Sequence, residues 1–514
     1  MNNIESFCLK NGIFYLGSEI YGGIKGIYDY GYLGKLLKQN FENLWRKYFL
    51  GLYDNFWEVE PSEIMHKNVF VASGHLENFN DPITECKKCK KRYRADKLLE
   101  ELLKIDCEGK TPEELYELIK KHNIKCQECG GELSEVKWFN LMFPVVIGPS
   151  SLELVKRIEL KDFERALELL DDYNKNTHYL RPETAQGPYI LFKREFEVHR
   201  RKLPLGLAVI GKAFRNEISP RQMLIRLREF TQAELQIFFD PEAFENEFDK
   251  LFDFNEVKDK EINVLMTKDR GSKDFKTLKA SELLEKLPKF YVYFLVKVFE
   301  FYTNVLKIPN SKIRFKELSE EEKAFYNKFH FDVEYYFDCF GEWKEIAGVH
   351  YRTDHDLSGH EKVSKELLRL KKTESGYQFS KEGFVPHVLE LSFGVDRNVL
   401  ALIDAFYDQG VFKLPYDLAP IKFAVLPLVS NNEAIVKKAK ELYKYLRSLG
   451  LKVVYEEKGS IGKRYNRLDE IGVYYALTID YETIEDDTFT IRHRDTKEQK
   501  RITKEDLKDY IKTI

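Results

Sequence analysis

Hydrophobic positions recur at helical spacing in the first part of the chain. Between residues 33 and 52 apolar side chains return every three or four positions, at Leu36, Leu37, Phe41, Leu44, Trp45 and Tyr48. This period gathers them on one stripe and leaves the polar residues on the other side. The pattern predicts an amphipathic helix whose apolar stripe is available to a partner subunit.

A different pattern begins near residue 420. Residues 423–426 have the composition of a buried strand, residues 433–449 that of an amphipathic helix, and residues 452–455 that of a second strand. A strand, a helix and a strand in this order are typical of a βαβ unit. We therefore predict a separate, slightly basic C-terminal α/β domain over residues 421–514.

Size and composition set limits on the rest. A chain of 514 residues with 43% hydrophobic content should divide into two or three globular domains. It contains no run of about 18 uncharged apolar residues, so we expect no membrane partner, and its first residues resemble no targeting signal, so we expect a cytoplasmic protein. Because the net charge is only −3, local basic patches would have to hold any nucleic acid.

Two Cys-x-x-Cys pairs, Cys86/Cys89 and Cys126/Cys129, lie 36 residues apart. Their spacing predicts a closed, structural zinc site with four thiolate ligands, and unligated reduced cysteines are the alternative. A helix starting at Thr111 would account for the long interval. Six of the eight residues 87–94 are basic, which fits either phosphate contacts or a solvated run of charge.

The strongest chemical signal follows the strand-like residues 207–210. Arg215 and Glu217 come next, and after a loop with Arg221 and Arg226 the chain resumes in strand-like residues around Phe230. An arginine on a rigid strand can neutralise charge that builds up on an α-phosphate. A carboxylate two positions along faces the same side and can accept a hydrogen bond from adenine, on which an aromatic ring can stack. These residues predict an adenylate pocket.

The extended block is recognisable as a family motif. Residues 214–221 (Phe-Arg-Asn-Glu-Ile-Ser-Pro-Arg) and 228–234 (Arg-Glu-Phe-Thr-Gln-Ala-Glu) closely resemble motif 2 of glycyl-tRNA synthetases of the α2 homodimer type, which are class II enzymes. Residues 180–187 (Leu-Arg-Pro-Glu-Thr-Ala-Gln-Gly) resemble the glycine-site signature of that family, and residues 390–397 resemble motif 3. Further similar segments are residues 18–23, 139–143 and 343–348.

The resemblance implies an α+β class II fold. Its catalytic domain would hold a six-stranded antiparallel sheet flanked by helices, and a homodimer would form around motif 1 near Pro61. The implied divisions are an N-terminal part over residues 1–85, a zinc-binding insertion over 86–129, the main catalytic part over 130–418 with an insertion at about 240–342 approaching the tRNA acceptor stem, and an anticodon-binding domain over 421–514.

The resemblance also implies the residues that meet ATP. Arg215, Arg397 and Glu345 are the implied catalytic residues. The implied ATP-binding residues are Arg215, Asn216, Glu217, Ile225, Arg226, Leu227, Arg228, Glu229, Phe230, Glu345, Ile346, Gly394, Val395, Asp396 and Arg397.

Glycine would be held by a second set of residues from the same motifs. The implied glycine-binding residues are Lys137, Glu183, Phe230, Thr231, Gln232, Ala233, Glu234, Arg352, Glu390, Leu391 and Ser392. Lys137 and Leu391 depart from the arginine and proline common in the family. Three carboxylates around one ammonium repel one another when the site is empty, so we expect at least one raised pKa.

The implied activity is that of a glycine–tRNA ligase, with ATP as substrate, Mg²⁺ and a structural Zn²⁺ as cofactors, and glycine and tRNA(Gly) as partners. Glycine would attack the α-phosphorus in line, and the tRNA ribose would then attack the glycyl-adenylate. Two alternatives remain open. One is a catalytically inactive tRNA-binding paralogue, and the other is a class II synthetase for another small amino acid.

Overall fold

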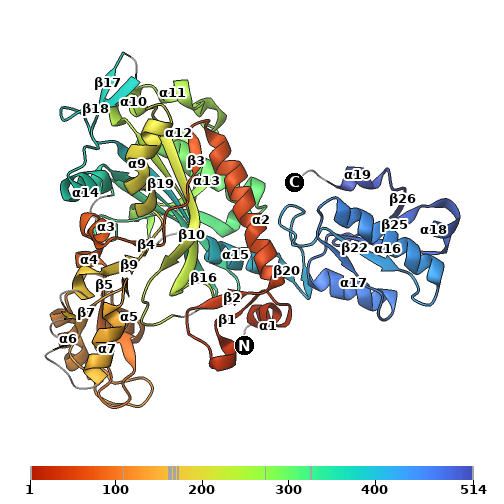
Figure 1. Ribbon diagram of the computed structural model, residues 1–514, viewed down its shortest axis with the longest axis horizontal. Helices are drawn as coiled ribbons and strands as arrows, with labels where there is room; N and C mark the ends of the chain where they lie inside the picture. The colour runs from red at the N-terminus through yellow and green to blue at the C-terminus, as the bar shows by residue number, and fades with distance from the viewer. Residues whose placement is uncertain are drawn as a thin grey trace.

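The computed structural model describes residues 3–511, apart from residues 108, 160–164, 166–168, 171–172, 221, 272–273, 324–326 and 375, so Arg221 lies outside the described part. A nine-stranded sheet forms its centre (Figure 1). In sheet order the strands are β13 (Lys276–Lys279), β12 (Glu261–Leu265), β14 (Ile313–Glu317), β15 (Phe329–Phe337), β16 (Glu342–Thr353), β19 (His387–Gly394), β11 (Glu229–Phe239), β10 (Leu205–Phe214) and β3 (Phe56–Glu58).

The six strands from β14 to β10 pair in antiparallel fashion, which confirms the implied six-stranded core. The sheet is wider than predicted, because β3 adds to β10 in parallel at one edge and β12 adds to β14 in parallel at the other. The three additional strands have only three to five residues each. Runs this short carry little periodicity.

One face of the sheet is covered by α2 (Tyr32–Phe49), α13 (Lys289–Glu300) and α15 (Val395–Phe406), which share its largest hydrophobic core. The helix predicted over residues 33–52 is therefore confirmed, although its last turn is a 3₁₀ helix, Leu50–Leu52. Trp45 and Phe49 of α2 contact Phe393 of β19, with ring centroids 6.0 and 5.0 Å apart. Its apolar stripe is thus buried within its own chain.

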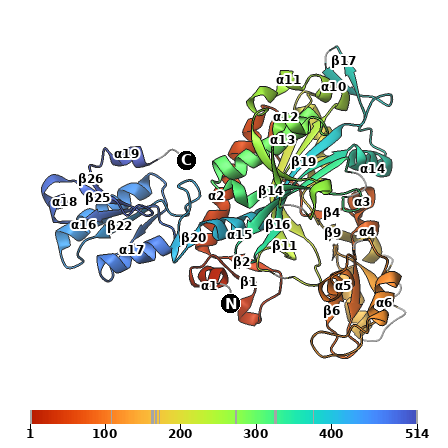
Figure 2. The ribbon, with the colours of Figure 1, turned by 180° about the vertical axis from the view of Figure 1, so that it is seen from behind.

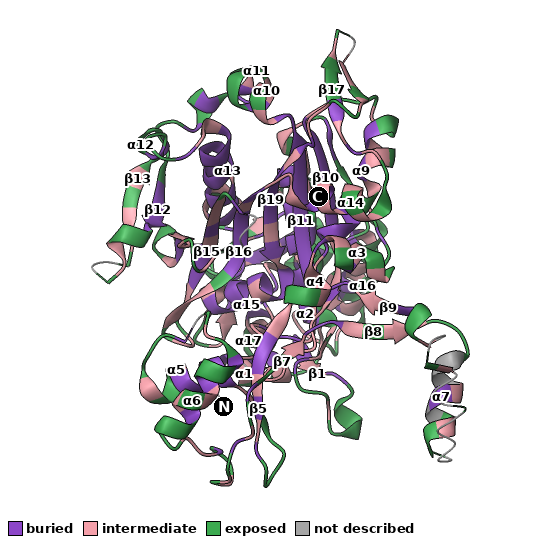
Figure 3. Cartoon of the chain, turned by 90° about the vertical axis from the view of Figure 1, so that its left-hand side faces the viewer, coloured by how far each residue is buried: buried purple, intermediate pink, exposed green. Residues whose placement is uncertain are grey.

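The other face of the sheet carries the site. There α9 (Gln186–Val198) packs over the ends of β10 and β11 with a smaller core, and α14 (His355–Ser364) packs beside it. Figure 3 shows the central strands buried, with exposed residues gathered on the surrounding helices and loops. No helix in the described part of the chain is long and apolar enough to cross a membrane.

The segment expected as an insertion at about residues 240–342 takes part in the central architecture. Strands β14 and β15 lie inside the sheet, and most residues of α13 are buried in the core. Figure 2 shows α13 and β14 from behind. Packing on all sides explains why α13 is hydrophobic all round. This segment therefore builds one side of the central sheet.

The cysteine pairs belong to a small module with its own core. It contains β5 (Asn80–Glu85), β6 (Arg92–Arg94), α5 (Ala95–Leu103), α6 (Pro112–Lys121) and β7 (Lys137–Asn140). The predicted helix is α6, whose start is fixed by reciprocal hydrogen bonds between Thr111 and Glu114. The module extends beyond residues 86–129, because β5 pairs with both β6 and β7.

The C-terminal domain confirms the βαβ prediction. Its five-stranded sheet has the order β23 (Val453–Tyr455), β22 (Phe423–Pro427), β24 (Tyr475–Ile479), β25 (Phe489–His493) and β26 (Gln499–Ile502). Strands β22, β23 and β24 are parallel, and α16 (Glu433–Ser448) makes the first crossover. In Figures 1 and 2 this domain lies on the opposite side of the central sheet from the cysteine module.

Candidate functional site: an adenylate pocket beside three buried glutamates

Strand β11 places two kinds of residue by simple alternation. Its odd-numbered residues Ala233 and Leu235 enter the core under α2 and α15, whereas Gln232 and Glu234 face the opposite side of the sheet. The neighbouring strand β19 presents Ser392 directly beside Glu234. Polar side chains from paired strands therefore converge on one face.

A pocket opens on this face near the ends of β11, β16 and β19. Its lining residues are Arg215, Glu217, Leu224, Ile225, Arg226, Leu227, Phe230, Thr231, Gln232, Glu345, Ala347, Ser392, Gly394, Asp396 and Arg397. Most of the residues implied for ATP are therefore gathered here. Gln232 and Ser392 connect the pocket to the buried carboxylates described below.

Arg215 is held rigidly at one wall of the pocket. Its Nε donates a 3.0 Å hydrogen bond to the carbonyl of Pro182. Its guanidinium lies 5.4 Å from the ring centroid of Phe79 and 5.2 Å from that of Phe230. Cation–π contacts and a backbone acceptor fix the charge without neutralising it. This arrangement suits the binding of a phosphate.

Arg397 lies at the start of α15 and closes another side of the pocket. Its Nε donates to the carbonyl of Ile225, and its Nη1 donates to the carbonyl of Glu345 and lies 3.0 Å from that residue's carboxylate. Glu345 owes its position to a β-bulge, because Glu345 and Ala347 pair with consecutive residues of β15 and leave Ile346 as the extra residue.

Five of the residues implied for ATP do not line this pocket. They are Asn216, Arg228, Glu229, Ile346 and Val395. The side chains of Ile346 and Val395 are buried in the core, and Glu229 forms a 2.9 Å ion pair with Lys212. Glu229 comes directly before the pocket residue Phe230 on β11, and successive residues of a strand face opposite sides.

Glu234 is a buried carboxylate on β11. One of its oxygens accepts hydrogen bonds from Ser392 at 2.6 Å and Gln232 at 3.0 Å, and the other accepts one from Thr184 at 2.6 Å. All of these partners are neutral. Burial, together with the nearby charges of Glu390 and Glu183, raises the pKa of Glu234 to about 8. This meets the expectation that one carboxylate of the empty site would hold a proton.

Basic side chains flank the other two glutamates. Arg352 donates to Glu390 at 3.1 Å and lies 3.7 Å from Glu183, while His350 contacts Glu390 and His75 lies 3.6 Å from Glu183. Burial opposes ionisation of both carboxyls, but Arg352 and His350 hold the pKa of Glu390 at about 2, and His75 and Arg352 hold that of Glu183 well below its usual range.

Four residues implied for glycine lie elsewhere. Ala233 and Leu391 point into the core on the far side of the sheet. Thr231 also faces that side, where its hydroxyl accepts from Lys38, although it reaches the rim of the pocket. Lys137 is exposed on β7 and lines a separate groove of the cysteine module, so the structure does not bring it to the carboxylates.

Several residues at the site carried no role in the sequence interpretation. They are His75, Phe79, Thr184, Gln186, His350 and Asp356. Thr184 and Gln186 lie inside the glycine-site signature at residues 180–187, so their position in the sequence could have indicated a place at the site. His75 and Phe79 lie at the start and just after the end of a short helix far away in the sequence, and no period or motif spacing connects them to the sheet.

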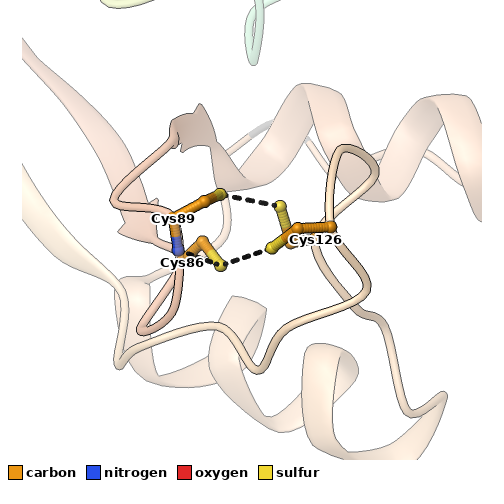
Figure 4. Close-up of side chains that lie close together, drawn as sticks. Cys86, Cys89 and Cys126 are labelled. Carbon is orange, nitrogen blue, oxygen red and sulfur yellow. Dashed lines mark hydrogen bonds between the residues drawn. The ribbon is translucent and has the colours of Figure 1, made fainter.

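The four predicted zinc ligands come together as expected. Their sulfur atoms all lie within 4.8 Å of one another. The sulfur of Cys86 lies 3.5 Å from that of Cys129, and the sulfur of Cys89 lies 3.5 Å from that of Cys126. Figure 4 shows Cys86, Cys89 and Cys126 gathered at this cluster. A tetrahedron with Zn–S bonds of about 2.3 Å has edges of about 3.8 Å. A Cβ atom at Gly131 would lie 2.9 Å from the sulfur of Cys86, so this turn requires glycine. The cluster fits Zn²⁺.

The basic run of residues 87–94 is largely matched by acidic neighbours. Five of its six basic side chains form ion pairs, with Glu132, Glu85, Glu128 and Asp81 among their partners. Such pairing favours the interpretation as a solvated run of charge over an open surface for phosphates.

Comparisons with known proteins agree with this geometry. Residues 166–406 match the family model "tRNA synthetase class II core domain (G, H, P, S and T)", and residues 422–514 match "Anticodon binding domain". A prolyl-tRNA synthetase structure from Cryptosporidium parvum, in complex with L-proline and AMP, superposes with a TM-score of 0.54 at 12% identity, covering 99% of this chain and 73% of that one. That likeness shows the fold.

Curated relatives are similar over nearly their whole length. The glycine–tRNA ligase of Pyrococcus horikoshii is 39% identical, with 99% of this chain and 98% of the relative covered. Those of Methanocaldococcus jannaschii and Aeropyrum pernix are 36% and 35% identical, covering 99% and 98% of this chain and 98% and 94% of the relatives. With the class II core and the buried glutamates in place, the chain belongs to the glycine–tRNA ligase family.

Proposed function

We propose that this protein activates glycine with ATP and transfers it to the 3′ end of tRNA(Gly). The observation that carries the proposal is the continuity of the two parts of the site. The arginine-lined pocket that suits a nucleotide opens through Gln232 and Ser392 onto Glu234, which lies close to Glu183 and Glu390. An amino acid and ATP bound there would meet where the adenylate must form.

In this proposal ATP is held mainly by the motif 2 strand and by α15. Arg215 and Arg397 approach the phosphates from two sides and neutralise the charge that develops as pyrophosphate leaves. Phe230 offers a ring face to adenine, and Glu217 offers an acceptor for its amino group. No covalent enzyme intermediate is needed, because positioning and charge neutralisation account for both steps.

Glycine would bind with its ammonium among Glu183, Glu234 and Glu390. A substrate without a side chain gives the enzyme only its ammonium and carboxylate to recognise, so selectivity depends on firm ammonium binding and on filled space beside Cα. The hydroxyl of Ser392 and the amide of Gln232 fill part of that space while holding Glu234. A larger amino acid would have to displace these hydrogen-bonded groups.

Two metal ions fit the residues present. Glu345 has a half-exposed carboxylate at the edge of the pocket, and hard oxygen ligands of this kind suit the Mg²⁺ that accompanies ATP phosphates. The four cysteines would hold a structural Zn²⁺ that stabilises the small module. Neither ion is required for the proposed assignment of the carboxylates to glycine.

The remaining partners follow from the domains. The C-terminal domain would contact the anticodon of tRNA(Gly), and two chains would form the homodimer expected around Pro61. A cytoplasmic location remains the expectation for this proposed activity. The two alternatives, an inactive paralogue and a synthetase for another amino acid, are separated from it by one measurement.

That measurement is amino-acid-dependent exchange between pyrophosphate and ATP, with glycine, alanine and serine compared. We expect exchange with glycine, little with alanine or serine, and none in the Arg215→Ala variant. Preferential exchange with alanine or serine would support a different synthetase. A chain that binds tRNA but exchanges with no amino acid would be the inactive paralogue.

A further inference from the structure

Five charged side chains of alternating sign form a row from the cysteine module to the ATP pocket. Arg94 binds Asp96 through its Nε at 3.0 Å and lies 3.0 Å from Asp81. Arg226 lies 3.5 Å from the other oxygen of Asp81 and binds Glu217 at 2.6 and 2.7 Å. The row therefore connects Asp96, at the start of α5, with Glu217, which lines the pocket.

The row is shielded from solvent along its whole length. Its side chains are 9–20% exposed. Pairs in such surroundings are screened less than surface pairs, and each charge depends on its neighbours for compensation. Displacing one member should therefore change the position of the next.

The row is also tied to the zinc ligands by short pieces of chain. Asp81 stands five residues before Cys86, and Arg94 stands five residues after Cys89. The strands between them, β5 and β6, are paired, with Arg94 opposite Ile83. A tight loop that returns from Lys91 to the backbone of Cys86 joins these strands, so the metal knuckle closes the hairpin.

A second contact secures the same hairpin. The hydroxyl of Tyr93, next to Arg94, lies 3.1 Å from the sulfur of Cys126 in the other cysteine pair. Loss of the ion would release both cysteine turns and with them the register that holds Arg94 against Asp81.

We infer that Asp81 and Arg94 are positioning residues through which the zinc module sets the place of Arg226 and Glu217 in the ATP pocket. The direction of the effect follows from competition between two carboxylates for one guanidinium. Without Arg94, the buried Asp81 keeps Arg226 as its nearest basic partner and draws it away from Glu217. The pocket then loses its preset shape, and ATP binds more weakly while glycine binding is unaffected.

The test compares Arg94→Gln with Arg92→Gln, since Arg92 belongs to the same strand but is exposed and pairs with Glu85. Dissociation constants for ATP and for glycine are measured separately by calorimetry, together with zinc content. We expect Arg94→Gln to keep its zinc and to bind ATP about fivefold more weakly, with a glycine constant within about twofold of wild type. Arg92→Gln should match wild type in both.

Removal of zinc by a chelator provides the second arm. Wild type and Arg92→Gln should lose ATP affinity when zinc is removed, whereas Asp81→Asn, whose Arg226 is no longer tied to the module, should not change. The Asp81→Asn arm remains decisive if Arg94→Gln fails to fold. An ATP affinity of wild type that is insensitive to zinc, an equal loss of glycine affinity, or unfolding of the whole zinc-free chain would overturn the inference.

The inference rests on the proposed function, and the two fail differently. A wild-type protein with zinc that binds no ATP would overturn both. A wild-type protein that binds ATP and exchanges with glycine, but whose ATP affinity ignores zinc and Arg94, would overturn this inference alone.

Discussion

Ser392 donates a 2.6 Å hydrogen bond to Glu234 across directly paired positions of β19 and β11. Thr184 donates a bond of the same length to the other oxygen of that carboxyl. Hydroxyl groups can donate or accept, so these two contacts can persist whether or not Glu234 carries a proton. The site is therefore built to change the protonation of Glu234 without rearranging its neighbours.

The first prediction concerns proton release. Because the pKa of Glu234 is raised to about 8 in the empty site, glycine binding at pH 7 should expel about one proton as the ammonium meets the carboxyl. Glycine affinity should rise between about pH 6.5 and pH 8, as the ionised fraction of Glu234 increases. Calorimetry in buffers of different ionisation enthalpy measures the proton directly. Binding at pH 7 without proton release would contradict this role for Glu234.

The raised pKa of Glu234 should also lower the stability of the folded protein as pH rises. Its folded pKa of about 8 lies above an unfolded value of about 4.3, so between these values the folded state binds more protons and loses stability as pH rises. Glu234→Gln has no such proton to lose. It should melt at least about 2 °C above wild type at pH 8.5, with a smaller difference at pH 5.5, while glycine-dependent exchange disappears. A melting temperature below wild type at pH 8.5 would refute this.

How far the sequence predicted this site depended on the geometry involved. The motifs identified Glu183, Glu234, Glu390 and Ser392, and the structure brings all four together. The side of the sheet that each side chain faces was predicted less well. Strand alternation alone would have placed Leu391 on the opposite side from Ser392 and Glu390. Lys137 was assigned by its place in a motif, but β7 belongs to the cysteine module and keeps its side chain outside the pocket.

Contacts between segments that are far apart in the chain could not be predicted from the sequence. His75 of α4 (His75–Asn78) lies 3.6 Å from Glu183, which belongs to a distant part of the chain, and Asp81 reaches Arg226 across 145 residues of chain. Hydrophobic period and motif spacing describe local structure only. For the same reason, the three short strands β3, β12 and β13 at the edges of the sheet were not predicted.

Arg215 offers a prediction about catalysis. Arg215→Lys keeps the charge but loses the planar group that lies near Phe79 and Phe230 and the bond to the carbonyl of Pro182. Lysine carries a compact, mobile charge that this setting does not fix. We expect the glycine-dependent exchange rate to fall about a hundredfold, with the dissociation constant for glycine within about threefold of wild type. A near-normal exchange rate in Arg215→Lys would show that the exact position of the positive charge at residue 215 is unimportant.

The zinc prediction has a matched control within the module. Wild type should contain one zinc ion per chain, and Cys126→Ser should lose it and melt at lower temperature. Cys107 is equally buried in the same core but lies outside the four-sulfur cluster, so Cys107→Ala should retain the full zinc content. The zinc content of the purified proteins is measured by metal analysis, and their melting temperatures are measured by thermal unfolding. Full zinc content in Cys126→Ser would exclude the tetrathiolate site.

The last prediction concerns Asp396 and asks whether this residue stabilises the fold or binds ATP. The sequence resemblance implied a contact with ATP, but the side chain of Asp396 is only 5% exposed. Its carboxylate accepts from Tyr30 at 2.6 Å and from the backbone of Thr231 at 2.5 Å, and lies 3.9 Å from Lys38. It thereby joins α2, β11 and α15. Asp396→Asn would leave the buried Lys38 short of compensation, at a cost of about 3 kcal/mol.

The expected signature of Asp396→Asn is therefore a large loss of stability with little change in ATP binding. The melting temperature should fall by several degrees, while the dissociation constant for ATP, measured well below that temperature, stays within about twofold of wild type. Lys38→Met should destabilise similarly, and the double variant should cost less than the two single changes together, since each removes the partner that the other leaves unpaired. A tenfold loss of ATP affinity at unchanged stability would instead assign Asp396 to the nucleotide.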